Sequence, residues 1–91
     1  MDDKLRLQEQ YTKLTEIIKV YLPDDVPQDA IHLNSHFTKE LNINSANLVD
    51  IVLDVEDTFD IMLENEDMDG MLTVADALAI IDRKIKAKAK V

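Results

Sequence analysis

The sequence predicts an all-α fold, a small four-helix bundle of three main helices and one short helix with a long first loop. Three segments repeat apolar residues at steps of three and four, the spacing that places side chains on one face of a helix. The chain has only one Gly and two Pro, too few for a sheet-rich fold with many tight turns. Its 91 residues fit one domain, residues 1–91, in which residues 86–91 are expected to form a frayed basic tail.

The first helix is predicted to begin at Asp2 and Asp3, because acids are favourable in a first helical turn. It is predicted to end before Pro23, since the residue that precedes a proline is disfavoured in the α region. The core-facing residues of this helix recur at helical spacing and are Leu7, Tyr11, Leu14, Ile18 and Tyr21 or Leu22.

The connection over residues 22–44 is long for a compact domain, so we expect its apolar side chains to hold it against the helices. These side chains are Val26, Ile31, Leu33, Phe37, Leu41 and Ile43. A short turn of helix is expected over residues 35–40.

The second helix is predicted over residues 45–59, and its buried face consists of Leu48, Ile51, Val52, Val55 and Phe59. An acidic segment over residues 60–72 follows, with a short helix over residues 64–69 that Gly70 ends. The expected buried residues of this segment are Met62, Leu63, Met68 and Met71.

The last helix is predicted to begin at Thr73-Val74-Ala75-Asp76, a capping box in which the two polar side chains bond each other's backbone amides. Its buried face consists of Val74, Ala77, Leu78, Ile81 and Ile85. The lysines that follow Lys84 suit a helix C-terminus, where the helix dipole favours positive charge.

The charge of the chain is −9, and the acids are concentrated in its second half. From Glu40 to Asp82 there are twelve Asp or Glu and no Lys or Arg. Such a surface repels nucleic acid and anionic membranes and suits basic partner surfaces. The chain has no cysteine, which excludes a disulfide, a thiolate metal site and a cysteine nucleophile. We find no membrane span and no signal peptide, and we expect a soluble, cytoplasmic monomer.

A single serine, Ser45, stands at the start of the second predicted helix, whose exposed side is strongly acidic. The acids on that side are Asp50, Asp54, Glu56, Asp57 and Asp60. A helix N-terminus carries partial positive charge and free N–H groups, so a phosphate attached to Ser45 would be favourably placed. No base lies near Ser45 in the sequence to make it a catalytic nucleophile. A serine that only caps the helix is the alternative.

The run Leu41-Asn42-Ile43-Asn44-Ser45-Ala46, followed by Glu56, Phe59 and Ile61 in register, resembles the attachment site of acyl carrier proteins. The family pattern reads roughly L-G-x-D-S-L, then an acidic helix that ends in E-x-x-F-x-I. The resemblance extends over residues 37–85, and the chain departs from the family pattern at Asn42, Asn44 and Ala46, where Gly, Asp and Leu are usual.

The resemblance implies a bundle of the acyl-carrier type that is not an enzyme and has no catalytic residue of its own. It implies that a transferase attaches 4'-phosphopantetheine from coenzyme A covalently to Ser45. The arm would hold acyl intermediates as thioesters and deliver them to fatty acid, polyketide or related biosynthetic enzymes with basic docking surfaces. The residues expected to contact partners are Asn44, Ala46, Asp50, Asp54, Glu56 and Asp57. Asn44 lacks a charge that transferases of the family use near a magnesium ion.

Two other functions stay open at this point. Five residues fit positions one, three, five, six and twelve of an EF-hand calcium loop: Asn65, Asp67, Asp69, Gly70 and Asp76. The chain could also be a carrier-like interaction protein in which Ser45 is never modified. We expect no metal site at His32, His36 and Glu40, because helix-start residues interrupt their spacing of four.

Overall fold

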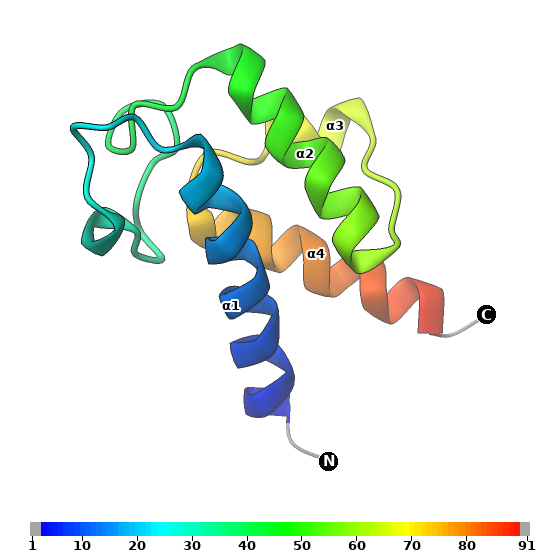
Figure 1. Ribbon diagram of the computed structural model, residues 1–91. Coiled ribbons are helices and arrows are strands. Elements are labelled where there is room, and N and C mark those ends of the chain that lie inside the picture. Colours follow the sequence, from blue (N-terminus) through cyan, green and yellow to red (C-terminus); the bar gives the residue numbers. More distant parts are fainter. Residues whose placement is uncertain (1–2, 90–91) are drawn as a thin grey trace.

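The computed structural model describes residues 3–89, and its regular elements are all helical (Figure 1). They are α1 (Asp3–Tyr21), the 3-10 helix η1 (Gln28–Ala30), α2 (Ser45–Phe59), α3 (Asn65–Asp69) and α4 (Val74–Ala89). Within the described residues the only β pairing is an isolated bridge between His36 and Thr73. The predicted all-α bundle of three main helices and one short helix is therefore confirmed, although Asp2 lies outside the described residues.

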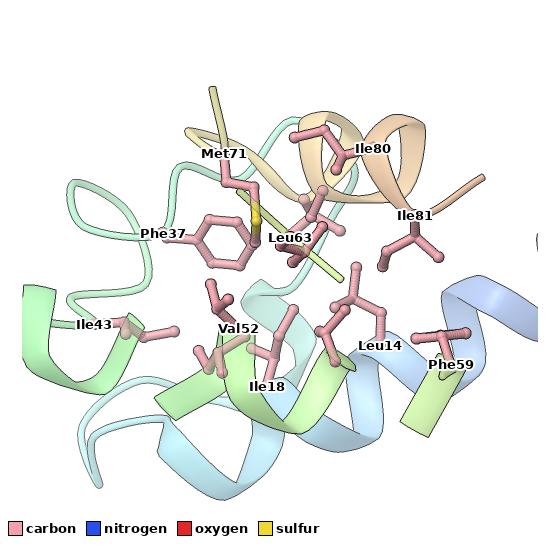
Figure 2. Close-up of a cluster of buried hydrophobic side chains, with 14 of the residues drawn as sticks. Leu14, Ile18, Phe37, Ile43, Val52, Phe59, Leu63, Met71, Ile80 and Ile81 are labelled. Carbon is pink, nitrogen blue, oxygen red and sulfur yellow. The ribbon is translucent and has the colours of Figure 1, made fainter. Parts of the chain in front are cut away.

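One hydrophobic core joins the helices and the long first loop, with α1 packed against both α2 and α4 (Figures 1 and 2). Figure 2 shows side chains from α1, α2 and α4 converging with Phe37 and Leu63 from the loops. Phe37 and Leu14 are fully buried. Burial of a large apolar side chain of this kind contributes about 1.5–3 kcal/mol, so these residues fix the positions of the helices.

Near its N-terminus, helix α1 buries the polar residue Gln10, whereas the apolar pattern predicted that Leu7 is buried there. Leu14 and Ile18 are buried as expected, but Leu7 is 42% exposed, whereas Gln10 is only 4% exposed. The Gln10 side chain donates to Asp82 of α4 (Nε2 to Oδ1, 3.3 Å), and Arg6 pairs with the same carboxylate at 3.2 Å. The prediction that Leu7 is buried was wrong because this polar contact sets how α1 faces α4 near its N-terminus.

The first loop contains a hydrogen-bonded turn at the predicted place and one short helix that was not predicted. Residues 35–40 form a turn, in which the carbonyl of His36 accepts from the amides of Glu40 and Leu41. The bond from Glu40 to His36 spans four residues, as in one turn of an α-helix, and the turn does not continue into a regular helix. His36 is also held by its bridge to Thr73. The unpredicted short helix is η1, which follows Pro27. The apolar residues of the loop are buried or half-buried except Leu33, which is 50% exposed.

Helix α2 has the bounds that its sequence predicts, and it ends at Asp60, which adopts a left-handed conformation with φ of 55°. The short helix α3 confirms the helix expected over residues 64–69, although Gly70 after it has an ordinary φ of −86°. Leu63 and Met71 are buried as predicted, whereas Met62 is 78% exposed, so its predicted burial was wrong.

Helix α4 begins at the predicted capping box: the amide of Thr73 donates to Asp76 Oδ2 at 3.1 Å, and the amide of Asp76 donates to Thr73 Oγ1 at 3.2 Å. The tail that was expected to fray from residue 86 is helical as far as Ala89. Lys88 donates to the carbonyl and the carboxylate of Asp60 at 2.7 and 2.8 Å, which ties the last turn to the end of α2. None of the helices within the described residues is long and apolar enough to cross a membrane.

Candidate functional site

The end of the first loop places Ser45 by means of two buried anchors. Leu41 and Ile43 are almost completely buried, and the amide of Ile43 donates to the carbonyl of Phe37 at 2.9 Å. Between the anchors, Asn42 has a φ of 55°. Asparagine tolerates this left-handed conformation better than most residues, and glycine adopts it freely. The backbone therefore explains why Asn42 can stand where the family pattern has Gly.

Asn44 caps the first turn of α2. Its side-chain oxygen accepts from the amide of Asn47 at 2.8 Å, and its carbonyl accepts from the amide of Leu48 at 2.9 Å. The cap of this helix is thus Asn44, and Ser45 is the first helical residue. Because Asn44 satisfies the capping role, the hydroxyl of Ser45 is not needed for it.

The serine and the helix N-terminus beside it are unused by the fold. Ser45 is exposed, and within the described residues neither its hydroxyl nor the amides of Ser45 and Ala46 have a hydrogen-bond partner. The first turn of α2 contains no acid. Free amides and an uncompensated helix dipole beside an exposed hydroxyl favour a covalently attached phosphate, so these residues fit such a group.

The acids of α2 divide into those that face solvent and those that the fold uses. Asp50 and Asp57 are exposed, and neither accepts a hydrogen bond from another described residue. Asp54 is half-buried and accepts from the Tyr21 hydroxyl at 2.6 Å. This hydrogen bond to Asp54 is the main cause that raises the pKa of Tyr21 to about 12.

Glu56 is also drawn into the structure. It is half-buried, and its Oε2 accepts from the amide of Leu63 at 2.8 Å, while its carbonyl accepts from the amide of Ile61 at 3.2 Å. Glu56 therefore fastens the turn after α2. Of the six residues expected to contact partners, Asn44, Ala46, Asp50 and Asp57 are exposed, whereas Asp54 and Glu56 have structural roles.

Two apolar residues on the exposed side of α2 were not predicted as part of the site. Val49 is 46% exposed and Leu53 is 55% exposed. Both lie outside the buried stripe of Ile51, Val52 and Val55. The same helical spacing that identified the buried stripe could have identified them, since both fall outside the stripe, Val49 directly before Asp50 and Leu53 between Asp50 and Asp57.

The residues of the proposed calcium loop do not form a loop. Asn65–Asp69 is the helix α3, and the buried carboxylate of Asp67 contacts Arg83 at 2.6 Å and Lys84 at 3.0 Å. Asp76 is occupied by the amide of Thr73. Within the described residues there is no group of three or more His, Cys, Asp or Glu that could hold a metal ion. The structure therefore argues against an EF-hand site.

The sequence matches a family model described as "Phosphopantetheine attachment site" over residues 12–81. It is 34% identical over 70 residues to an acyl carrier protein of Exiguobacterium, which is 77% of this chain and 86% of the relative. It is 31% identical over 77 residues to an acyl carrier protein of Petrotoga mobilis, which is 85% of this chain and 88% of the relative. An acyl carrier protein of Thermotoga maritima has the same fold, with a TM-score of 0.78 at 23% identity over 96% of this chain and 99% of that chain.

The fold and the matched family model define a small helical carrier, a class of protein that presents an attached group to other proteins. The chain belongs to the acyl carrier protein family. The family's prosthetic group is a covalently attached phosphopantetheine. Members of the family carry acyl groups rather than catalyse their conversion.

Proposed function

We propose that Ser45 carries the phosphopantetheine of this acyl carrier protein. The observation that supports this most directly is the combination at one helix start of an exposed serine hydroxyl, two amides without acceptors and a first turn without acids. The bound arm supplies a terminal thiol that holds an acyl group as a thioester, which a cysteine-free chain lacks.

The chain's own part in the modification is to present the nucleophile. In the transfer from coenzyme A, the Oγ of Ser45 forms a bond to phosphorus and loses its proton, and adenosine 3',5'-bisphosphate leaves as the phosphoanhydride bond breaks. The transferase supplies the base and the magnesium ion. The free amides and the dipole of α2 stabilise the negative phosphodiester that results. Asn44 holds the helix start open for it by using its own side chain as the cap.

The test is intact-protein mass spectrometry after incubation with coenzyme A, magnesium and a broad-specificity phosphopantetheinyl transferase. We expect one phosphopantetheine addition in the parent protein and none in Ser45→Ala. Addition to another residue would refute the site but not the family. Failure to modify the parent with several transferases would instead favour an unmodified, carrier-like interaction protein.

We further propose that partner enzymes with basic surfaces dock on the exposed part of α2. This part comprises the exposed acids Asp50 and Asp57, with Asn44 and Ala46 beside Ser45 and with the exposed apolar residues Val49 and Leu53. Exposed acids attract a basic partner at long range, and the apolar pair offers area for close contact. Asp54 and Glu56 contribute less in this proposal because the fold already uses their carboxylates.

The docking proposal is tested with Asp50→Lys and Asp57→Lys, measured as the rate of phosphopantetheine transfer at low and high salt. We expect slower transfer at low salt and a smaller difference at high salt, because salt screens exposed charges. Glu9→Lys is the matched control, since Glu9 is exposed and the variant makes the same charge change in the N-terminal half of α1. That half of α1 lies far from the first turn of α2 (Figure 1). Equal rates for all three variants would refute the docking surface.

A further inference from the structure

An open groove runs between α1 and α2, beside the proposed docking surface. It has a volume of about 510 Å³ and is lined by side chains of both helices, among them Ile17 and Val20 of α1 and Asp54 and Asp57 of α2. In Figure 1 the C-terminal end of α1 lies toward α2, whereas its N-terminal end points away. Because Asp57 belongs both to the groove and to the docking surface, the two features are continuous.

The α1 side of the groove is apolar. Val20 is 75% exposed, and Ile17, one helical turn before it, is half-buried. Residues three apart on a helix are neighbours, so the two branched side chains form one strip along the groove. A single exposed apolar residue is ordinary, but a strip that lines a concavity offers area that a partner can cover.

The end of α1 that carries Val20 is fixed beside the acids of α2. The hydroxyl of Tyr21, the next residue, donates to Oδ2 of Asp54 at 2.6 Å. This hydrogen bond, then partial burial, then the negative charges of Asp54 and Asp50, raise the pKa of Tyr21 to about 12. The contribution of Asp50 indicates that this exposed acid also lies near the end of α1. Val20 therefore has a set position relative to the acids of the docking surface.

The charged residues of the groove leave one carboxylate available. Glu16 pairs with Lys19 at 3.0 Å, and Asp54 accepts from Tyr21. Asp57 has no hydrogen bond or ion pair within the described residues. The groove thus combines an apolar strip with an unpaired carboxylate, which suits a side chain that has an apolar stem and a positively charged end.

We propose that this groove receives a lysine or arginine side chain of the transferase that modifies Ser45, so that α1 is part of the docking surface. The stem of that side chain packs over Ile17 and Val20, and its charged end pairs with Asp57. This inference rests on the proposed docking surface of α2 and extends it to a second helix. Exposed acids alone attract any basic protein, whereas an apolar strip at a fixed place beside Asp57 favours a partner of matching shape.

The experiment is steady-state kinetics of the transferase, with the unmodified protein as the varied substrate. Val20→Ala should raise the KM for the protein by about fivefold through lost apolar contact. The kcat should stay nearly the same, because the contact is equal in the bound and transition states. The rise should persist at high salt, whereas the rise caused by Asp57→Asn should shrink. Leu5→Ala is the matched control, since Leu5 is 53% exposed on α1 and does not line this groove.

The double variant Val20→Ala/Asp57→Asn tests whether one side chain contacts both residues. In that case its KM should rise by less than the product of the two single effects, because the second change removes a contact that is already weakened. A rise equal to the product would overturn the shared side chain.

The role of α1 and the docking surface of α2 fail in different ways. If Val20→Ala reacts like the parent or like Leu5→Ala while Asp50→Lys and Asp57→Lys slow transfer, the role of α1 is overturned and the docking surface of α2 stands. If neither acid variant slows transfer, the docking surface itself fails and this inference fails with it. Melting temperatures confirm that each variant is folded, and Val20→Thr replaces Val20→Ala if the latter is not.

Discussion

The starts of α2 and α4 are both capped, but they leave very different groups available. At α4 the capping box uses the amides of Thr73 and Asp76, and the amides of Val74 and Ala75 donate to loop carbonyls at 3.1 and 2.8 Å. At α2 the cap uses the amides of Asn47 and Leu48, which leaves those of Ser45 and Ala46 free. A helix N-terminus can therefore serve as a phosphate site only where the loop before it does not fold back onto its amides.

The same contrast separates two serines. Ser35 is 3% exposed, and it both donates and accepts within the turn that leads to α4. Ser45 is exposed, and neither its hydroxyl nor its amide has a hydrogen-bond partner within the described residues. One hydroxyl holds the loop on the start of α4, and the other is free to react. The chemical difference lies in the surroundings of the two side chains and not in their type.

Exchanging each serine for alanine should produce the largest effects. One exchange should affect phosphopantetheine addition, and the other should affect the unfolding free energy. Ser45→Ala should abolish phosphopantetheine addition and change the unfolding free energy by less than about 0.5 kcal/mol. Ser35→Ala should keep the addition but lower the unfolding free energy by about 1–3 kcal/mol, since it leaves partly buried backbone groups without partners. Mass spectrometry and urea unfolding measure the two outcomes. A loss of stability in Ser45→Ala equal to that in Ser35→Ala would show that the contrast is false.

The carboxylate of Asp67 gives the second test of the comparison, because its hydrogen bonds and ion pairs show that polar groups near α4 have partners within the fold. The amide of Glu64, then Lys84 and Arg83, hold the pKa of Asp67 below its usual value. A lowered pKa means that Asp67 stabilises the fold above its unfolded pKa of about 3.9, and that this stability is lost as the pH falls through the folded value.

Asp67→Asn should therefore lower the unfolding free energy at pH 7 by about 1.5–3 kcal/mol, the usual contribution of hydrogen bonds to a charged group. The deficit should shrink as the pH falls below about 4, where the parent also loses the charge. Urea unfolding at pH 7, 5 and 3 measures it, and Asp24→Asn in the exposed loop is the control. A deficit that is the same at every pH would contradict the ionic role of Asp67.

The features that the sequence predicted correctly are those with local causes. The bounds of α2 follow from its apolar stripe and its cap, and the capping box of α4 lies within four residues. Leu7, Leu33 and Met62 were predicted wrongly because burial depends on which distant element covers a side chain. The turn at residues 35–40 likewise depends on Thr73, which is far away in the sequence.

The candidate site shows the same division. Ser45 could be placed at a helix start from the sequence, because the start of an amphipathic pattern is a local signal. The hydrogen bonds of Asp54 and Glu56 within the fold could not be predicted from the sequence, since their partners Tyr21 and Leu63 lie in other elements. The free amides beside Ser45 are a property of the loop before α2, and only its folded path reveals them.

Placing an acid in the first turn of α2 should remove the advantage of its free N-terminus. Ala46→Asp would make the first turn of α2 similar to that of α4, which contains Asp76. We expect the rate of phosphopantetheine transfer to fall by about tenfold, equivalent to about 1.4 kcal/mol, because the carboxylate repels the incoming phosphate. Stability should not fall, since an acid there complements the helix dipole. Ala46→Asn is the uncharged control, and an unchanged rate for Ala46→Asp would count against the role of the free amides.

The smallest effect concerns the cap itself. Asn44→Asp restores the residue that the family pattern has at this position, and Asp caps a helix about as well as Asn, so stability should change by less than about 0.5 kcal/mol. Unlike an acid at residue 46, a carboxylate at residue 44 would accept from the amide of Asn47, as the Asn44 side chain does, and would precede the first turn. The resemblance to the family implies that this charge assists the transferase near its magnesium ion. We therefore expect transfer to speed up by a few-fold, on the scale of about 0.3–1 kcal/mol for a charge at a helix end.

Asn44→Ala separates the capping role of residue 44 from its role in transfer, because it should lower the unfolding free energy by about 1 kcal/mol without the gain in rate. If Asn44→Asp and the parent react at the same rate over a range of magnesium concentrations, residue 44 acts only as the cap that keeps the start of α2 open.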